Sequence, residues 1–301
     1  MLDGKVVVIT GAGGGIGRDI ALMAGAHGAK VVVNDIGASL DGRGKDSEPA
    51  EGVAEEIRNA GGTAVVSLDS VVDTDGAQNI IRVAVDAFGC VDGIVNNAGI
   101  LRDAFFHKMT DEEWDRVLKV HLYGSYNVSR AAAPVFKQQQ TGSLVHMTST
   151  SGLVGNIAQA NYSAAKLGIV GLSKSIALDM QRFGVRSNCI APFAWSRMIS
   201  SIKVDSPEQQ ERVARLQQMT PAKVAPLAIY LLSDHARAVT GQIFCVRNNE
   251  IFLFSQPRPV RSVQRQDGWT PEGIADHAMP ALSASFHRME VSADVFSWDP
   301  V

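Results

Sequence analysis

The feature that most constrains the fold of this chain is the alternation of short, β-branched runs with longer helical patterns. The runs "KVVVIT" and "KVVVND" are typical, because apolar residues occupy consecutive positions instead of alternating with polar ones. Strands have this pattern when helices bury both of their faces, as happens in parallel sheets. The alternation therefore predicts an α/β fold with a doubly wound parallel sheet in three layers.

Strands and helices are expected to alternate over most of the chain. The strands are expected at 5–10, 30–35, 63–68, 91–97, 143–149, 185–191 and 242–246. The helices are expected at 15–27, 49–60, 74–88, 111–138, 160–182 and 221–233. After about residue 247 the alternation stops, and only an extended segment at 250–254 and a short helix near 271–277 are expected. We therefore expect one main domain over 1–250 and a C-terminal extension over 251–301, which packs on that domain or on a neighbouring subunit.

Composition and charge argue against several classes of function. The chain has 301 residues, of which 46% are hydrophobic and 20% charged, and its net charge is −3. Because no run of lysine and arginine stands out, nucleic acid and anionic membranes are not expected as partners. No apolar run is long enough to insert into a membrane, and Cys90, Cys189 and Cys245 lack the spacing of a disulfide framework or a metal site. These features fit a globular protein of a reducing compartment, the cytoplasm.

A glycine-rich loop follows the first expected strand and precedes the first expected helix. Its sequence, "TGAGGGIG", has the pattern T-G-x-x-x-G-x-G through Thr10, Gly11, Gly15 and Gly17. The stricter G-x-G-x-x-G pattern fails, because Ile16 takes its last position. Glycines at such a turn let the backbone approach a pyrophosphate, and the helix N-terminus supplies free N–H groups. We expect Gly11, Gly15, Ile16 and Gly17 to bind a dinucleotide, in preference to a glycine-rich turn without a ligand.

Polar residues end the next strands at the edge where such a ligand would lie. Asp35 ends the second strand, where a carboxylate can accept hydrogen bonds from both hydroxyls of the adenosine ribose and repels a 2′-phosphate. NAD is therefore favoured over NADP as the cofactor. Asp69 and Ser70 follow the third strand and are expected near the adenine, whereas Asn97 and Gly99 in "NNAG" follow the fourth. Asp35 alone would be equally well explained as a solvated acid in a loop.

The stretch "ANYSAAKLGIVGLSKSIALDM" places a tyrosine and a lysine four residues apart on one expected helix. Tyr162 and Lys166 then share a helix face. An ammonium near a phenol favours the phenolate, so Lys166 is expected to lower the pKa of Tyr162 from its usual value near 10. Ser149, at the end of the fifth strand, could hold the same substrate oxygen. We expect these three residues to be catalytic, with Tyr162 as the acid–base group.

Two of the expected helices, 111–138 and 160–182, carry small and apolar residues around much of their circumference. A helix that is apolar on more than one face needs a second partner. We therefore expect a homodimer or a homotetramer.

These motifs together resemble a known family, the short-chain dehydrogenases/reductases. "TGAGGGIG", "NNAG", Ser149 and "YSAAK" stand in the order and spacing of that family, over roughly residues 3–246. The resemblance implies a Rossmann-type fold and the catalytic set Ser149, Tyr162 and Lys166. It also implies that Lys166 holds the nicotinamide ribose and that Asn97 and Gly99 border the cofactor.

One branch of the family is similar over longer stretches, namely the (3R)-hydroxyacyl-CoA dehydrogenase domain of peroxisomal multifunctional enzyme type 2 and its bacterial relatives. The stretches that carry this likeness include "VVVNDIGASLDGRGK", "NNAGILRD" and "GNIAQANYSAAKLG". His121 stands where the wider family usually has an asparagine that anchors a water of the proton relay. It either replaces that asparagine or is a structural hydrogen-bonding residue.

The expected function is that of an NAD-dependent oxidoreductase, which interconverts a secondary alcohol and a ketone in lipid metabolism. The substrate implied by the resemblance is (3R)-hydroxyacyl-CoA, and residues 193–219 are expected to lie over the nicotinamide, with apolar Trp195, Met198 and Ile199. A 3-oxoacyl-carrier-protein reductase and a steroid or steroid-acyl-CoA dehydrogenase are alternatives. A different class, an inactive protein that senses NAD(H), usually loses the Tyr or the Lys, both of which this chain keeps.

Overall fold

The computed structural model describes residues 1–39, 42–44, 46–194 and 216–301. Within these residues the chain forms one eight-stranded sheet with the order β3-β2-β1-β4-β5-β6-β7-β8. The strands are β1 Val6–Thr10, β2 Lys30–Asn34, β3 Thr63–Ser67, β4 Gly93–Asn96, β5 Gly142–Met147, β6 Val185–Phe193, β7 Ile243–Arg247 and β8 Glu250–Leu253. Neighbours are parallel except β7 and β8, which pair antiparallel. Because the strand order reverses between β1 and β4, the sheet is doubly wound, as expected.

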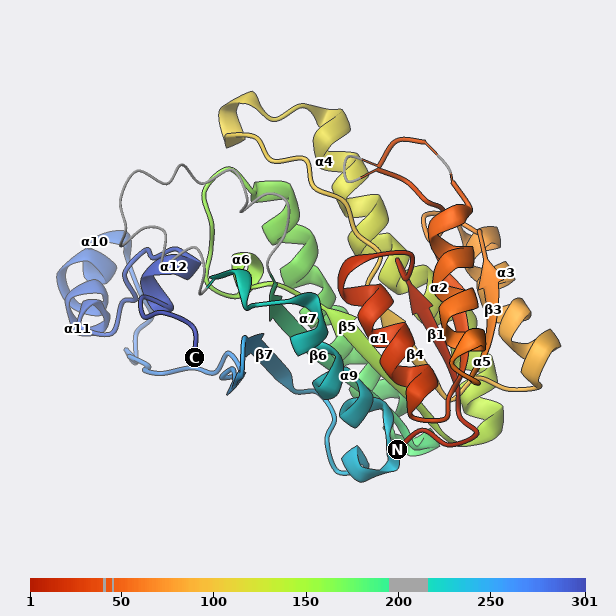
Figure 1. Ribbon diagram of the computed structural model, residues 1–301. Helices are drawn as coiled ribbons and strands as arrows, with labels where there is room; N and C mark the ends of the chain where they lie inside the picture. Colours follow the sequence, from red (N-terminus) through yellow and green to blue (C-terminus); the bar gives the residue numbers. More distant parts are fainter. Residues whose placement is uncertain (40–41, 45, 195–215) are drawn as a thin grey trace.

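Helices cover both faces of this sheet and complete the three layers (Figure 1). The helices are α1 Gly15–Ala26, α2 Glu48–Asn59, α3 Thr74–Phe88, α4 Asp111–Leu118, α5 Gly124–Gln139, α6 Thr150–Leu153, α7 Ala160–Met180, α9 Ala225–Leu232, α10 Pro271–Gly273, α11 Met279–Ser283 and α12 Ser292–Val295. Helices α1, α2 and α9 pack on one face, whereas α3, α5 and α7 pack on the other. No helix among the described residues combines the length and the apolar character needed to cross a membrane.

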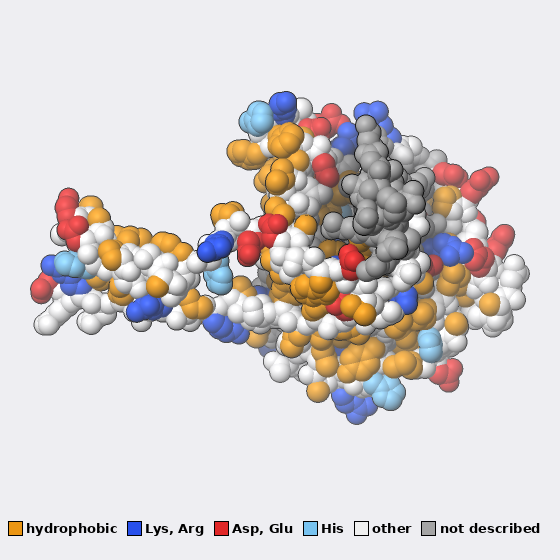
Figure 2. All heavy atoms as spheres, turned by 60° about the vertical axis from the view of Figure 1, so that its left-hand side comes forward, with side chains coloured by type: hydrophobic (Ala, Val, Ile, Leu, Met, Phe, Trp, Pro, Cys, Tyr) orange, Lys and Arg blue, Asp and Glu red, His pale blue; other side chains and the backbone are white. Residues whose placement is uncertain are grey.

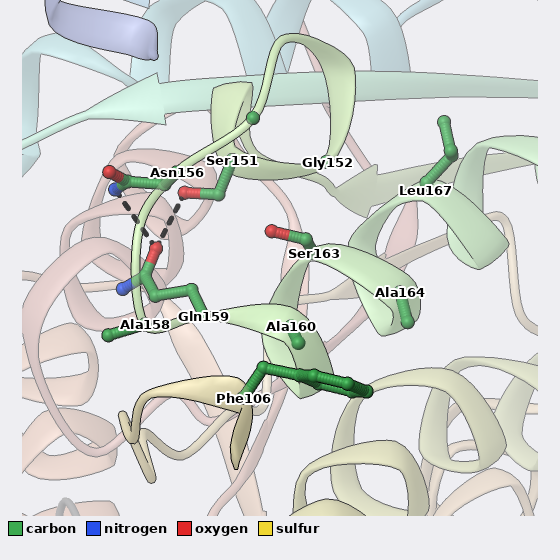
Figure 3. A pocket seen from close by; sticks show the side chains of 11 residues that line it. Phe106, Ser151, Gly152, Asn156, Ala158, Gln159, Ala160, Ser163, Ala164 and Leu167 are labelled. Atoms are coloured by element: carbon green, nitrogen blue, oxygen red, sulfur yellow. Dashed lines mark hydrogen bonds between the residues drawn. The ribbon is translucent and has the colours of Figure 1, made fainter. Parts of the chain in front are cut away.

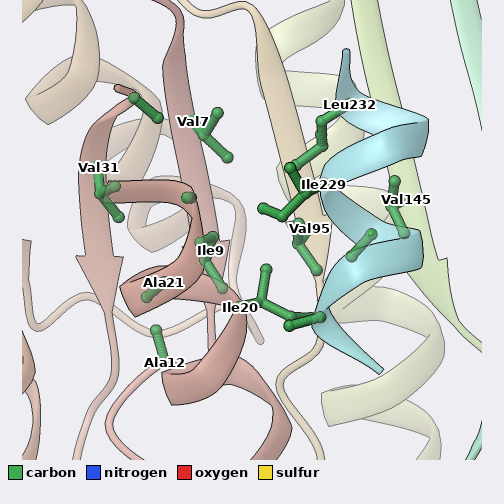
Figure 4. Packing of buried hydrophobic residues seen from close by; sticks show 14 of the residues in the cluster. Val7, Ile9, Ala12, Ile20, Ala21, Val31, Val95, Val145, Ile229 and Leu232 are labelled. Carbon is green, nitrogen blue, oxygen red and sulfur yellow. The ribbon is translucent and has the colours of Figure 1, made fainter. Parts of the chain in front are cut away.

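Two hydrophobic clusters hold the layers together, one on each side of the sheet. In β1, Val7 and Ile9 belong to the cluster under α1 and α9, while Val6 and Val8 belong to the cluster under α3 and α5. Figure 4 shows the first cluster, in which side chains of α1 and α9 meet those of β1 and β4. Successive strand residues point to opposite faces, so a strand that is buried on both faces must be apolar throughout.

The long helix expected at 111–138 is interrupted in the middle. Helix α4 ends at Leu118, a π-helical turn spans Lys119–Tyr123, and α5 continues from Gly124. The hydroxyl of Ser125 donates a 2.7 Å hydrogen bond to the carbonyl of the residue four positions earlier, inside the π-helical turn. A turn of this kind often marks a functional site. The four-residue helices α6 and α12 were likewise not expected from the sequence.

Most of the expected strands and helices are confirmed, including the extended segment near 250–254 and a helix beginning at Pro271. The segment at 193–219, which was expected to lie over the nicotinamide, falls mostly outside the described residues. Its proposed apolar contacts, Trp195, Met198 and Ile199, lie entirely outside them.

The C-terminal extension leaves the sheet after β8 and later returns to it. Helices α10 and α11 lie away from the sheet (Figure 1) and form a lobe that stands out from the body of the molecule (Figure 2). Large apolar side chains are exposed there, with Phe286 62% and Met289 98% accessible. Helix α12 then comes back, and Phe296, just after it, packs with Phe193 and Phe252.

Candidate active site

The glycine-rich loop between β1 and α1 is tightly wound against the end of β4. Gly11 has a φ of +64°, and a Cβ on Gly17 would collide with the carbonyl oxygen of Gly11. The side-chain amide of Asn97 donates to the carbonyls of Thr10 and Gly11, at 3.1 and 3.0 Å. The loop therefore needs glycine at two of the expected positions, and Asn97 fixes its shape from the neighbouring strand.

Gly15 and Ile16 begin α1, so their backbone N–H groups belong to the first helical turn. Such N–H groups have no carbonyl partner within the helix and carry the positive end of its dipole. The side chain of Ile16 packs against the core cluster beneath the loop. This arrangement suits an anionic pyrophosphate above the loop.

Asp35 lies directly after β2 and faces the glycine loop. Its carboxylate accepts hydrogen bonds from the backbone N–H groups of Gly13 and Gly37, each at 2.8 Å. A Cβ on Gly13 would lie 3.0 Å from this carboxylate and 2.9 Å from Pro49. The two hydrogen bonds hold the carboxylate at the carboxyl end of the strand, where the ribose of a dinucleotide would lie.

The residues after β3 are held by hydrogen bonds of their own. The carboxylate of Asp69 accepts from Ser67 Oγ at 3.0 Å and from the amide of Asn79 at 3.2 Å. Ser70 Oγ accepts from the backbone N–H of Val72 at 3.2 Å. These contacts fix Asp69 and Ser70 at the same edge of the sheet as Asp35. This position is compatible with the expected place of both residues near the adenine.

The expected catalytic residues come together between the end of β5 and the start of α7. Lys166, which is buried, donates a 2.6 Å hydrogen bond from Nζ to the carbonyl of Met147, and its Nζ lies 5.4 Å from the ring centroid of Tyr162. Ser149 caps the N-terminus of α6 and hydrogen-bonds with Tyr162. Thr148 Oγ1 adds a 2.7 Å bond to the carbonyl of Lys166. Strand β5 and helix α7 are thus clamped together at the point where the three side chains meet.

The electrostatics of this site differ from the expectation. Burial raises the pKa of Tyr162 to about 12, although the hydrogen bond with Ser149 acts in the opposite direction. Burial also lowers the pKa of Lys166 to about 7. The expectation that the pKa of Tyr162 lies below its usual value is therefore wrong for the protein alone. Removal from water disfavours both charged forms, the phenolate and the ammonium.

His121 lies in the π-helical turn and joins this cluster. Its ring packs edge-on against Tyr162, with 5.2 Å between the centroids, and Nε2 lies 2.7 Å from the carbonyl oxygen of Ile100. Burial, and then the charge of Lys166, lowers the pKa of His121 to about 3, so the ring is neutral at pH 7. A Cβ on Gly99 would collide with this ring. Gly99 thus makes room for the imidazole, a role that the sequence motif alone does not reveal.

A cavity of about 420 Å³ opens between the first turns of α7, helix α6 and the loop that joins them. Its lining includes Phe106, Ser151, Asn156, Gln159, Ser163 and Leu167 (Figure 3). Ala160, Ala164 and Leu167 are spaced along one face of α7, and helical periodicity places Tyr162 on a different face. None of Ser149, Tyr162 and Lys166 lines this cavity, although Ser151 and Gly152 of α6 do. Phe105 and Phe106 are 55% and 78% exposed, so neither belongs to the core.

Among the described residues, no group of three or more His, Cys, Asp or Glu side chains is arranged to hold a metal ion.

Comparison with known proteins places this geometry in context. The profile of a family described as enoyl-(acyl carrier protein) reductase matches residues 11–248. A short-chain type dehydrogenase/reductase of Mycobacterium tuberculosis is 52% identical over 82% of this chain and 83% of its own length. The hydroxyacyl-CoA dehydrogenase ChsB1 of the same organism is 36% identical over 90% of this chain and 86% of its own length.

Two further comparisons agree with these. The peroxisomal multifunctional enzyme type 2 of Mus musculus is 41% identical over 91% of this chain, which spans 36% of the mouse enzyme. The crystal structure of a short chain dehydrogenase from Mycobacterium avium has a TM-score of 0.83 and 37% identity, covering 96% of this chain and 98% of that one. The resemblance inferred from the motifs is thereby confirmed. This chain belongs to the short-chain dehydrogenase/reductase family.

Proposed function

We propose that this chain is an NAD-dependent dehydrogenase/reductase that interconverts (3R)-hydroxyacyl-CoA and 3-oxoacyl-CoA, with Tyr162 as its acid–base group. The observation that carries the proposal is the gathering of Ser149, Tyr162 and Lys166 where β5 meets α7. They lie at the carboxyl edge of the sheet that also carries the glycine loop. An inactive NAD(H) sensor has no need for this hydrogen-bonded set.

The pKa of Tyr162 determines whether its phenol is protonated at neutral pH. Because burial holds the pKa of Tyr162 at about 12, the phenol is protonated at pH 7. In the direction of reduction, Tyr162 donates this proton to the ketone oxygen while Ser149 Oγ holds that oxygen. In the direction of oxidation, Tyr162 must first ionise, so oxidation is favoured by higher pH. A bound nicotinamide supplies or accepts the hydride at the carbon.

The cofactor contacts follow from the residues at the carboxyl edge of the sheet. We assign the pyrophosphate to Gly11, Gly15, Ile16 and Gly17, where the helix N-terminus favours an anion. Asp35 is assigned to the adenosine ribose, and its negative charge supports NAD over NADP. Asp69 and Ser70 are assigned to the adenine side. Asn97 and Gly99 border the crevice, and Tyr162 and Lys166 face the nicotinamide end.

The substrate class rests on the names of relatives. The relative of M. tuberculosis named as a hydroxyacyl-CoA dehydrogenase aligns along most of both chains, which favours a CoA thioester over a free alcohol. A reductase of acyl-carrier-protein substrates and a dehydrogenase of steroid-bearing CoA esters remain the competing assignments within the same chemistry.

We also propose that the chain acts as a homodimer or homotetramer through α5 and α7. Tyr126 on α5 and Leu167 and Leu178 on α7 are 49%, 51% and 75% exposed. An apolar surface on two adjacent helices favours a self-complementary interface. Residues 1–250 are taken as the dinucleotide-binding and catalytic domain and 251–301 as its extension. A cytoplasmic location is part of the proposal, supported by cysteines that are all free in the structure.

The direct test is the absorbance change at 340 nm with purified protein and either NAD or NADP. The panel comprises (3R)- and (3S)-hydroxyacyl-CoA of short, long and steroid-bearing chains, with the matching carrier-protein esters. We expect turnover of (3R)-hydroxyacyl-CoA with NAD. Tight NADH binding without turnover of any member of the panel would favour an inactive NAD(H) sensor. Preference for carrier-protein esters would favour a 3-oxoacyl-carrier-protein reductase.

A further inference from the structure

The segment 292–301 contacts two other parts of the chain, the turn at Gly155 and the end of β6 at Phe193. We call these two parts the walls. At one wall, the backbone N–H and the hydroxyl of Ser292 both donate to the carbonyl of Gly155, at 3.1 and 3.3 Å. At the other wall, the ring of Phe296 lies 5.0 Å from that of Phe193, the last residue of β6. These contacts join parts of the chain that are more than 100 residues apart.

Both walls are connected to Ser149 through neighbouring elements. The turn that contains Gly155 follows α6, the helix that Ser149 caps at its N-terminus. In the parallel pairing of β5 with β6, Met147 is opposite Ile190, so Ser149 and Phe193 lie at the same edge of the sheet, just beyond that pair. Ligands in a parallel sheet bind outside this edge. Phe193 therefore lies on the side of Ser149 away from β1, and the turn at Gly155 is joined to Ser149 by the short helix α6.

The segment is itself held by a buried arginine and its partners. Arg247, which is 5% exposed, forms a 3.2 Å ion pair with Glu250 and lies 5.2 Å from the ring of Trp298. Trp298 Nε1 donates to Glu250 at 2.8 Å, and the backbone N–H of Asn249 donates to the carbonyl of Val301 at 3.0 Å. These contacts attach the segment to the turn between β7 and β8. Because the segment is fixed there, its contacts with the two walls can hold both walls in place.

We propose that residues 292–301 are a brace that positions both walls of the acyl side of the site and so sets the affinity for the acyl group. Phe296 and Ser292 are its positioning residues, because neither contacts the reacting atoms. The proposal rests on the proposed function for the identity of the substrate. It does not depend on it for the position of the walls, because that can be measured without a substrate.

The test compares Phe296→Ala with Phe136→Ala. Phe136 is equally large and fully buried, but it lies in the cluster under α3 and α5, away from the brace. We expect Phe296→Ala to raise KM for long-chain 3-hydroxyacyl-CoA about tenfold, because small misplacements of a binding wall are costly. The value of kcat should stay within about threefold and the Kd of NADH within about twofold.

Phe136→Ala should change neither KM nor the Kd of NADH. Phe296→Leu, which keeps apolar contact with Phe193, should restore most of the affinity, and Phe136→Leu is its control if the alanine variants do not fold.

Hydrogen exchange separates failure of the brace from failure of the proposed function. In Phe296→Ala, peptides covering 148–159 and 186–194 should exchange faster, while those covering 6–17 should not change. If these peptides exchange as in the wild type, the brace does not position the walls and the proposal is overturned. It is also overturned if exchange rises but KM stays constant, or if Phe136→Ala raises KM equally. If the wild-type protein turns over no 3-hydroxyacyl-CoA, the proposed function fails, and the exchange result alone decides whether the walls are braced.

Discussion

The proposed cofactor end and the proposed acyl end of the site are built by different means. At the cofactor end, Asn97 and Asp35 fix the glycine loop through hydrogen bonds to its backbone, at the ends of neighbouring strands. At the acyl end, the turn at Gly155 is held by Ser292, and Phe193 by Phe296. Backbone geometry therefore dictates the residue types at the cofactor end. At the acyl end, contacts between segments distant in the sequence hold the structure.

Tyr162 lies between the two ends. Removing its hydroxyl should therefore affect the rate of the chemical step without affecting the binding of cofactor or substrate. Tyr162→Phe should lower kcat by about 1000-fold, because a positioned acid–base group contributes 10²–10⁴-fold. The Kd of NADH and the KM of the acyl substrate should change little, because the ring and its contact with His121 are retained. Steady-state kinetics and fluorescence titration with NADH measure both quantities. Retention of most of kcat would remove Tyr162 from the proposed role.

Gly17→Ala attacks only the cofactor end. The new Cβ would collide with the carbonyl of Gly11 and lie 2.6 Å from the amide of Asn97, so the loop must open. We expect the Kd of NADH to rise about 100-fold, as phosphate N–H contacts are lost. Gly14→Ala is the matched control, since a Cβ there has no neighbour within 4 Å. Equal effects of the two substitutions would show that loop shape is not what Gly17 provides.

Acid should destabilise the catalytic region through two buried histidines. Burial lowers the pKa of His121 to about 3 and that of His146 to about 4, from 6.5. The folded state then binds fewer protons than the unfolded state, so this stability is present above pH 6.5 and is lost as pH falls towards 4. Each histidine should cost about 2 kcal/mol of unfolding free energy between pH 7 and pH 5.

Urea unfolding at the two pH values measures this cost. His146→Gln should remove about half of the pH dependence, while His27→Gln, at an exposed position, serves as the control. An unfolding free energy that does not change between pH 7 and pH 5 would mean that both histidines are protonated in the folded protein, or exposed.

Asp35→Ser should give the mildest of these changes, a shift in cofactor choice. Without the carboxylate, a 2′-phosphate is no longer repelled, and we expect the preference for NAD over NADP to fall about tenfold. The KM of the acyl substrate should stay the same, because Asp35 belongs to the cofactor end. The ratio of kcat/KM for the two cofactors reports the change. An unaltered ratio would place ribose recognition elsewhere.

The sequence predicted the sheet and the glycine loop because both leave local patterns. Strands buried on two faces must be apolar throughout, and a loop that allows no Cβ must have glycine, as at Gly11 and Gly17. The π-helical turn around His121 left no such pattern, because its residues are also compatible with an α-helix.

Two other features could not be read from the sequence for different reasons. The contacts of Ser292 with Gly155 and of Phe296 with Phe193 depend on which distant segments meet, and no spacing encodes that. The pKa of Tyr162 was assigned in the wrong direction because the spacing to Lys166 shows that a cation is near but not how completely water is excluded. Burial is a property of the assembled fold.

The central claim is that Tyr162 is a half-buried acid–base group that keeps its proton in the protein alone. The positive charge of a bound oxidised nicotinamide should favour the phenolate and so lower the pKa of Tyr162. Its most direct test is the titration of the tyrosine Cζ resonances by ¹³C NMR, with Tyr162 assigned by comparison with Tyr162→Phe. In the protein alone, Tyr162 should remain protonated beyond pH 11. With oxidised NAD bound, its pKa should fall by about 2 units. A titration near pH 10 or below in the free protein, or the same midpoint with and without NAD, would contradict the account.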